Sequence, residues 1–171
     1  YVGPVYLRFG RLAAPVINDE ASYKFEIGKG VELRDGKDCT IIATGLCVSA
    51  SLEAAEALKA KGIDAQVINI HTIKPLDEEA VMSAIMDTRR IITVEDHEVM
   101  GGLGSAVAEV VAKSGKACAF KMLGHQNAFS TIGLQEDLLA MAKIDANGIS
   151  EAIGEMMHAD FEADDAWDDE F

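Results

Sequence analysis

Residues 91 to 106 read Ile-Ile-Thr-Val-Glu-Asp-His-Glu-Val-Met-Gly-Gly-Leu-Gly-Ser-Ala. A β-branched run opens this stretch, an acidic segment and a glycine-rich turn follow, and the residues after the turn are rich in alanine and valine. This order is typical of a strand joined to the crossover helix of a parallel sheet. The stretch therefore predicts an α/β fold in which the acidic segment is a loop at the carboxyl end of a strand.

The rest of the main part of the chain alternates in the same way. Buried strands are predicted at residues 39–44, 65–70, 90–94 and 117–122, and a brief extended segment at 25–33. Helices are predicted at residues 48–62, 77–86, 103–115, 134–142 and 149–157, with Asp145 or Asn147 as the cap of the last one. Strands and helices that take turns predict a three-layer α/β sandwich, in which helices cover both faces of a mostly parallel sheet of about five strands.

The two ends of the chain depart from this pattern. Residues 5–9 suggest a short strand, and the loop through Pro15 has neither helical nor strand periodicity. We expect residues 1–22 to be the end of a preceding domain plus a linker, and residues 23–158 to be the main domain. Seven acidic residues lie among the last twelve, so residues 159–171 are expected to form a solvated, disordered tail.

Composition narrows the class of protein. A chain of 171 residues can form one domain and bury about 70% of the surface that its unfolded form exposes. No apolar run approaches the roughly 20 residues that span a bilayer, and no basic, apolar leader opens the sequence, so a cytoplasmic protein without membrane association is expected. The net charge of −14 disfavours nucleic acids as partners, because their recognition needs a basic face.

The cysteines and histidines predict no metal site. Cys39, Cys47 and Cys118 are odd in number and form no CxxC motif, which argues against a disulfide framework. No pair of histidines, or of histidine with cysteine, has the spacing of zinc ligands. Cys47 precedes a predicted helix, where backbone N–H groups would favour a thiolate, but a small residue required for packing is the stronger interpretation.

The turn Gly101-Gly102-Leu103-Gly104 shares glycines with the dinucleotide-binding fingerprint, but its spacing fails. The position of the third glycine holds Val107, and the acidic residues before the turn would repel phosphate. A tight turn and close packing of the following helix explain the glycines better.

His97 is the histidine placed best for a function, because α/β folds collect ligands at the carboxyl ends of their strands. Its acidic neighbours, Glu95 among them, would favour the imidazolium form. Two roles stay open for His97 and Glu95: a subunit interface at which the histidine pairs with carboxylates, or the rim of an active site. No residue of the chain is assigned a catalytic role.

Two further stretches join residues 91–106 in one pattern: Gly3-Pro4-Val5-Tyr6-Leu7-Arg8-Phe9-Gly10-Arg11 and His71-Thr72-Ile73-Lys74-Pro75-Leu76-Asp77. Together they resemble the C-terminal region of transketolases, most closely the split type in which this region belongs to a separate polypeptide. The resemblance covers the chain from Val2 to about Met157. The stretch Gly124-His125-Gln126-Asn127-Ala128-Phe129 looks more like transketolase than like its relatives, 1-deoxy-D-xylulose-5-phosphate synthase and the β subunit of 2-oxoacid dehydrogenases.

This resemblance implies an enzyme that moves a two-carbon ketol unit between sugar phosphates, using thiamine diphosphate and a divalent cation such as Mg²⁺. In that family a GDG motif with a downstream asparagine holds the metal, and a glutamate of the pyrimidine-binding domain activates the cofactor. The chain has no GDG, and the residues before Arg11 are too few to include that glutamate. The resemblance thus implies the third domain, which binds neither cofactor nor metal, is inactive alone, packs against the thiamine-binding domains or subunit, and contributes to a homo-oligomer.

Arg11 is the residue to which the resemblance assigns a substrate contact. In transketolases and deoxyxylulose-phosphate synthases, an arginine three residues after the last strand of the pyrimidine-binding domain contacts the phosphate of the sugar. Aligning residues 4–11 with that stretch puts Arg11, rather than Arg8, at this position. A guanidinium suits the role because it donates two parallel hydrogen bonds to phosphate oxygens.

The sequence is compatible with three classes of protein. The chain is the C-terminal domain of a transketolase, the equivalent domain of 1-deoxy-D-xylulose-5-phosphate synthase or of a 2-oxoacid dehydrogenase β subunit, or a non-enzymatic interaction module. The sequence upstream of Tyr1 would separate them, because only an enzyme needs a pyrimidine-binding domain there.

We expect that truncation after about Asp160 leaves folding intact, because the predicted tail has too little apolar surface to offset the entropy lost on ordering it. Thermal melts of the full and truncated chains measure this. The two melting temperatures should agree within about 5 °C, and a larger fall would mean that the tail docks on the domain.

Overall fold

Segments rich in apolar residues form the inner strands of the sheet in the computed structural model, which describes residues 1–158. Strands β2 (Cys39–Ala43) and β3 (Ala65–Asn69) are buried at every residue, as expected for parallel strands that are covered on both faces. Strand β4 (Arg90–Glu98) is buried over its first part and becomes more exposed at its end. The predicted tail, residues 159–171, lies outside the described residues.

The five strands follow the order β1-β3-β2-β4-β5. The pairs β3 with β2, β2 with β4, and β4 with β5 (Ala119–His125) are parallel. Strand β1 (Val31–Arg34) is antiparallel to β3 and forms one edge of the sheet, while β5 forms the other. The predicted mostly parallel sheet of about five strands is confirmed.

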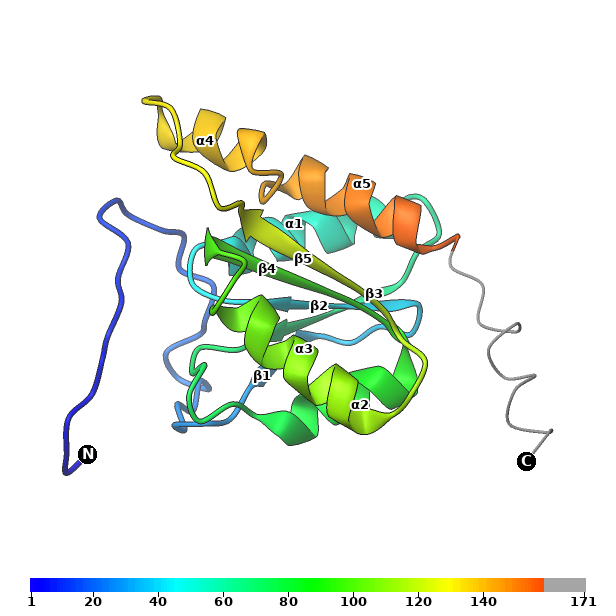
Figure 1. Cartoon of the computed structure of the whole chain (residues 1–171), viewed down its shortest axis with the longest axis horizontal. Helices are drawn as coiled ribbons and strands as arrows, with labels where there is room; N and C mark the ends of the chain where they lie inside the picture. Colours follow the sequence, from blue (N-terminus) through cyan, green and yellow to red (C-terminus); the bar gives the residue numbers. More distant parts are fainter. Residues whose placement is uncertain (159–171) are drawn as a thin grey trace.

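Helices cover both faces of this sheet (Figure 1). Helices α1 (Cys47–Lys59) and α5 (Ala146–Met156) pack over one face, and α4 (Gln135–Met141) continues their layer. Helices α2 (Glu78–Asp87) and α3 (Leu103–Ser114) pack over the other face. None of these described helices has both the length and the apolar character required to span a bilayer.

Each face of the sheet has its own apolar core, because side chains alternate along the strands. Ile41 and Ile92 contribute to the core under α1 and α5. Their chain neighbours Ile42 and Ile91 contribute to the core under α2 and α3. The predicted three-layer sandwich is therefore the observed architecture.

Helix α5 begins at Ala146, three residues before its predicted start. The Asp145 side chain accepts a hydrogen bond from the backbone N–H of Gly148 at 3.0 Å, which satisfies one of the unpaired donors of the first helical turn. Of the two predicted caps, Asp145 is the one that the structure confirms.

Two predictions about strands are wrong. Residues 5–9 form no strand, since a strand needs a neighbour for its backbone hydrogen bonds and the described residues form no such ladder with this segment. The acidic segment at residues 95–98 is not a loop but the end of β4, where Glu98 pairs with His125 after an irregularity in register that begins at Val94.

Candidate functional site

The carboxyl ends of β2, β4 and β5 lie along one edge of the sheet, on the side where the N-terminal segment runs in Figure 1. Parallel strands bring residues that are distant in sequence together at this edge, which is where α/β folds bind ligands. Five polar or titratable residues lie there and are called the carboxyl-edge cluster: Cys47, Glu95, Asp96, His97 and His125.

Glu95 is the buried acid of this cluster, with 1% of its surface exposed. Its carboxylate oxygens accept hydrogen bonds from the backbone N–H groups of Leu103 and Gly104, both at 2.7 Å. These two donors belong to the first turn of α3, where they have no partner within the helix and where the helix dipole favours negative charge. Glu95 therefore caps α3 from the strand that precedes it.

The glycine-rich turn makes room for this contact. A Cβ atom at Gly102 would collide with the Glu95 carboxylate. A Cβ atom at Gly104 would come within 2.8 Å of the Met122 sulfur atom, so this position keeps α3 close to the sheet. The interpretation of these glycines as residues for a tight turn and close helix packing is confirmed.

Asp96 connects three segments of the chain. Its Oδ1 accepts a hydrogen bond from Nε2 of His125 at 2.9 Å, and its backbone carbonyl accepts one from Nη2 of Arg8 at 2.8 Å. The side chains of Asp96 and His125 are partly exposed, at 29% and 28%. Strands β4 and β5 and the N-terminal segment are thus joined through one residue at the carboxyl edge.

His97 is the more exposed histidine of the cluster, with 45% of its side chain accessible. Its Nδ1 lies 2.8 Å from the backbone carbonyl oxygen of Glu98 and 3.9 Å from Oε2 of Glu95. Because the Glu95 carboxylate is already bound to α3, its interaction with His97 is electrostatic over a longer distance. The structure brings the two predicted residues together, one buried and one at the surface.

Cys47 is fully buried at the start of α1. Burial raises the pKa of its thiol to about 12, and the negative charges of Asp96 and Glu95 act in the same direction. A thiol with this pKa is protonated at neutral pH and is a poor nucleophile. These observations support the interpretation of Cys47 as a packing residue.

Arg11 lies in the irregular N-terminal segment and is exposed. No hydrogen bond or ion pair joins its guanidinium to another residue within 1–158. Arg8, three residues earlier, makes the contact with the carboxyl edge instead. The phosphate contact of Arg11 stays a prediction.

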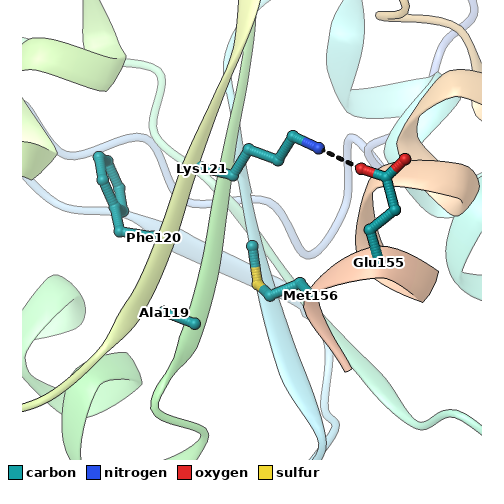
Figure 2. A pocket seen from close by; sticks show the side chains of 5 residues that line it. All are labelled: Ala119, Phe120, Lys121, Glu155 and Met156. Carbon is teal, nitrogen blue, oxygen red and sulfur yellow. Dashed lines mark hydrogen bonds and ion pairs between the residues drawn. The ribbon is translucent and has the colours of Figure 1, made fainter. Parts of the chain in front are cut away.

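The described residues contain no group of three or more His, Cys, Asp or Glu side chains that could hold a metal ion. A hollow of about 250 Å³ lies between β5 and α5 (Figure 2). Lys121 reaches from β5 to Glu155 of α5 at 2.6 Å, and this hydrogen bond lowers the pKa of the Glu155 carboxyl group. Both side chains are well exposed, so the pair is a surface ion pair rather than a binding site.

The sequence did not predict that Arg8, Asp96 and His125 form a connected group. Asp96 lies near the end of β4 and His125 ends β5, and only the order of strands in the sheet makes them neighbours in space. Arg8 is 88 residues from Asp96 in the chain, and no spacing or motif links them. The sequence contains one signal for the proximity of Asp96 and His125, which is that both residues follow apolar, strand-forming segments.

Comparison with known proteins identifies relatives over most of the chain. Residues 28–149 match the family model of the transketolase C-terminal domain. A 6-deoxy-6-sulfo-D-fructose transketolase subunit from Clostridium sp. (strain MSTE9) is 42% identical over 156 residues, which are 90% of this chain and 47% of that protein. A 1-deoxy-D-xylulose-5-phosphate synthase from Heliobacterium modesticaldum is 36% identical over 161 residues, which are 94% of this chain and 25% of that protein.

A solved structure shares the fold as well. A split gene transketolase, in the form of an inactive β4 tetramer, superposes with a TM-score of 0.85 and 35% sequence identity. The match covers 91% of this chain and 50% of that one. The chain therefore spans about half the length of the transketolase subunits that it matches.

We expect Glu95→Ala to lower the free energy of unfolding by about 3 kcal/mol, because the change leaves two N–H donors of α3 buried without an acceptor. Urea denaturation of the purified chain measures this loss. Glu109→Ala is the matched control, since Glu109 lies on α3, the helix that Glu95 caps, and its side chain is 72% exposed. The control should stay within about 0.5 kcal/mol of the original chain, and an equally small effect at position 95 would contradict the capping role.

Proposed function

Because the chain belongs to the transketolase C-terminal domain family, we propose that it is the C-terminal domain of an enzyme that transfers a two-carbon ketol unit between sugar phosphates. The observation that carries this proposal is the 42% identity to a transketolase subunit over 90% of the chain. Such an enzyme uses thiamine diphosphate and a divalent cation. The chain spans about half of that relative, so the activity belongs to the longer assembly in which the chain works.

The residues of this chain do not fit the cofactor. The sequence has no GDG motif, and the part of the chain that the structure describes has no metal-binding group. The acids of the carboxyl edge would repel a diphosphate. We therefore assign thiamine diphosphate and Mg²⁺ to the thiamine-binding domains or subunit, and we expect this chain alone to be inactive.

Residues 1–22 are proposed to be the end of the pyrimidine-binding domain plus a linker, and residues 23–158 the C-terminal domain. Large apolar side chains in the first segment support this division, because Tyr6 is 89% exposed and Phe9 is 82% exposed. Apolar surface of this kind is normally covered by another domain or protein. The thiamine-binding part of the enzyme would cover it here.

Arg11 is proposed to bind the phosphate of the sugar. Its exposed guanidinium lies on the segment that leads toward the proposed pyrimidine-binding domain, and the contact of Arg8 with Asp96 ties this segment to the carboxyl edge. His97 and Glu95 are proposed to lie at the rim of the active site or at the interface with the thiamine-binding part. The exposure of His97 supports this role, while Glu95 would act by holding α3 and the turn before it.

The proposed partners are the thiamine-binding domains or subunit of the same enzyme and further copies of this chain. The similar split gene transketolase forms a tetramer of its β chains, which supports self-assembly here. We also propose a cytoplasmic location for the enzyme. Neither a nucleic acid nor a membrane is expected as a partner.

A second candidate is the C-terminal domain of 1-deoxy-D-xylulose-5-phosphate synthase. The 36% identity to such a synthase over 94% of the chain supports it. A 2-oxoacid dehydrogenase β subunit and a non-enzymatic module are the remaining alternatives. Assays of the complete protein with ketose phosphate donors, or with pyruvate and glyceraldehyde 3-phosphate, separate the enzymes, and no activity in any assay would leave the module.

We expect that this chain alone neither binds thiamine diphosphate nor transfers ketol units, because its sequence contains no GDG motif. Calorimetric titration of the chain with thiamine diphosphate and Mg²⁺ is the measurement. Binding in the micromolar range by the isolated chain would refute the assignment of the cofactor to the rest of the enzyme.

We expect Arg11→Ala, made in the complete enzyme, to raise the KM for phosphorylated sugars about tenfold or more. A lost hydrogen bond to a charged group costs roughly 1.5 to 3 kcal/mol, and each 1.4 kcal/mol is about a factor of ten. Steady-state kinetics measure the change.

An unphosphorylated acceptor is the control for this variant, and its kinetics should barely change. Arg8→Ala is the matched second variant, because Arg8 contacts Asp96 rather than the proposed phosphate site. Equal losses on phosphorylated and unphosphorylated substrates would make Arg11 a structural residue of the linker.

A further inference from the structure

Residues 95–97 lie in an irregular part of the sheet, because the register of β4 with β5 shifts between Val94 and Glu98. Such a shift disrupts the ladder locally and is common beside functional sites. Asp96 is in the middle of this part. Its backbone carbonyl accepts a hydrogen bond from Nη2 of Arg8, which lies 88 residues away in the chain. The irregular end of β4 is thus where the N-terminal segment is attached.

The side chain of Asp96 is held by the neighbouring strand. Its Oδ1 accepts a hydrogen bond from Nε2 of His125 at 2.9 Å, and Nε2 is the donor because an ionised carboxylate can only accept. His125 also accepts a hydrogen bond on its backbone carbonyl from the N–H of Val99 at 3.0 Å. One residue of β5 therefore holds the irregular end of β4 at two places. We call the two side chains the Asp96–His125 pair.

The N-terminal segment rests on this edge of the sheet. The guanidinium of Arg8 donates to the Asp96 carbonyl at 2.8 Å. Two residues later, a Cβ atom at Gly10 would lie 4.0 Å from Cδ2 of Leu46, the residue before α1. This part of the segment thus passes over the turn between β2 and α1, beside the carboxyl ends of the strands (Figure 1).

These contacts limit where Arg11 can lie. It follows Arg8 by three residues, which span at most about 10 Å of extended chain, so a fixed Arg8 keeps Arg11 near the carboxyl edge. The segment around Arg11 has no helix or strand of its own, and its course therefore depends on contacts of this kind. A group that binds a substrate needs a defined position, since a small misplacement weakens its contribution.

We propose that the Asp96–His125 pair is a positioning element for phosphate recognition. The pair holds the Asp96 carbonyl where Arg8 binds it, and the bound Arg8 in turn sets the place of Arg11 against the sugar phosphate. This inference rests on the proposed function and on the proposed role of Arg11. It adds two positioning residues, from β4 and β5, that act through the N-terminal segment without touching the substrate.

Trypsin cleavage of the purified chain tests whether the pair holds the segment. Trypsin must take the Arg8 side chain into its own specificity pocket, so the hydrogen bond to Asp96 protects this site. His125→Ala should raise the rate of cleavage after Arg8 about threefold or more, because cleavage follows the population of the released segment. Mass spectrometry of the products measures the rate at each site.

The same digestion contains its own controls. Lys24 is exposed in another irregular part of the chain, and cleavage after it should keep its rate in His125→Ala. His158→Ala is the matched variant, since His158 is an exposed histidine that follows α5. It should change neither rate.

Steady-state kinetics of the complete enzyme test whether the pair acts on phosphate recognition. His125→Ala should raise the KM for phosphorylated sugars about three- to fivefold and leave both kcat and the KM for an unphosphorylated acceptor unchanged. Asp96→Ala keeps the backbone carbonyl but removes the carboxylate, so it should give the same rise. His125→Gln keeps an N–H donor and should restore most of the original KM.

A double-mutant cycle tests whether the effect passes through Arg11. In the Arg11→Ala background, His125→Ala should cause no further rise in KM, because the group that the pair positions is already absent. Arg8→Ala should follow the same pattern, since it removes the contact between the segment and Asp96. Circular dichroism melts show that each variant folds, and Asp96→Ala serves for the same cycle if His125→Ala does not.

Three results would overturn the proposal. These are an unchanged rate of cleavage after Arg8 in His125→Ala, a KM that rises equally or not at all for phosphorylated and unphosphorylated substrates, and a full further rise in the Arg11→Ala background. Any of them, in an enzyme that transfers ketol units, leaves the proposed function standing. An original enzyme without ketol transfer would instead reject the proposed function, and the trypsin rates would then decide whether the pair holds the segment.

Discussion

The contact between the Glu95 carboxylate and the first turn of α3 is the constraint on which the carboxyl edge depends. Removing a carboxylate from water costs several kcal/mol, and here two backbone N–H groups at a helix N-terminus replace the water. The contact holds the start of α3 directly against the end of β4. It also explains why the turn contains Gly102, since a side chain at that position would occupy the space of the carboxylate.

Because side chains alternate along β4, the position of Glu95 also sets the direction of its neighbours. Glu95 and His97 point to the α3 side of the sheet, whereas Asp96 points to the α1 side and meets His125. The carboxyl-edge cluster therefore consists of two halves with different character. In one half a buried acid lies near an exposed histidine, and in the other an acid–histidine pair lies above the buried thiol of Cys47.

The strands show how far the sequence predicts the structure. Segments rich in apolar residues, such as residues 39–44 and 65–70, predict buried parallel strands, and both strands form. The acidic residues 95–98 read as a loop because polarity usually marks exposure, but Glu95 is buried by its bond to α3 and Glu98 is held by pairing with β5. Residues 5–9 have the composition of a strand, yet a strand also requires a neighbour. Arg8, Asp96 and His125 could not be grouped because their proximity depends on strand order.

Two of the exposed apolar regions within residues 1–158 differ in how far their backbone is already ordered. Residues 1–16 have no helix or strand, so any partner that covers them must also order their backbone, at a cost of about 1 to 2 kcal/mol per residue. This cost is consistent with the proposal that the segment is the end of another domain, whose folding would order it. The exposed apolar side chains Leu134 and Met141 lie instead at helix α4, which is anchored to the core through Leu139. A partner that covered this side of α4 would therefore order little additional backbone.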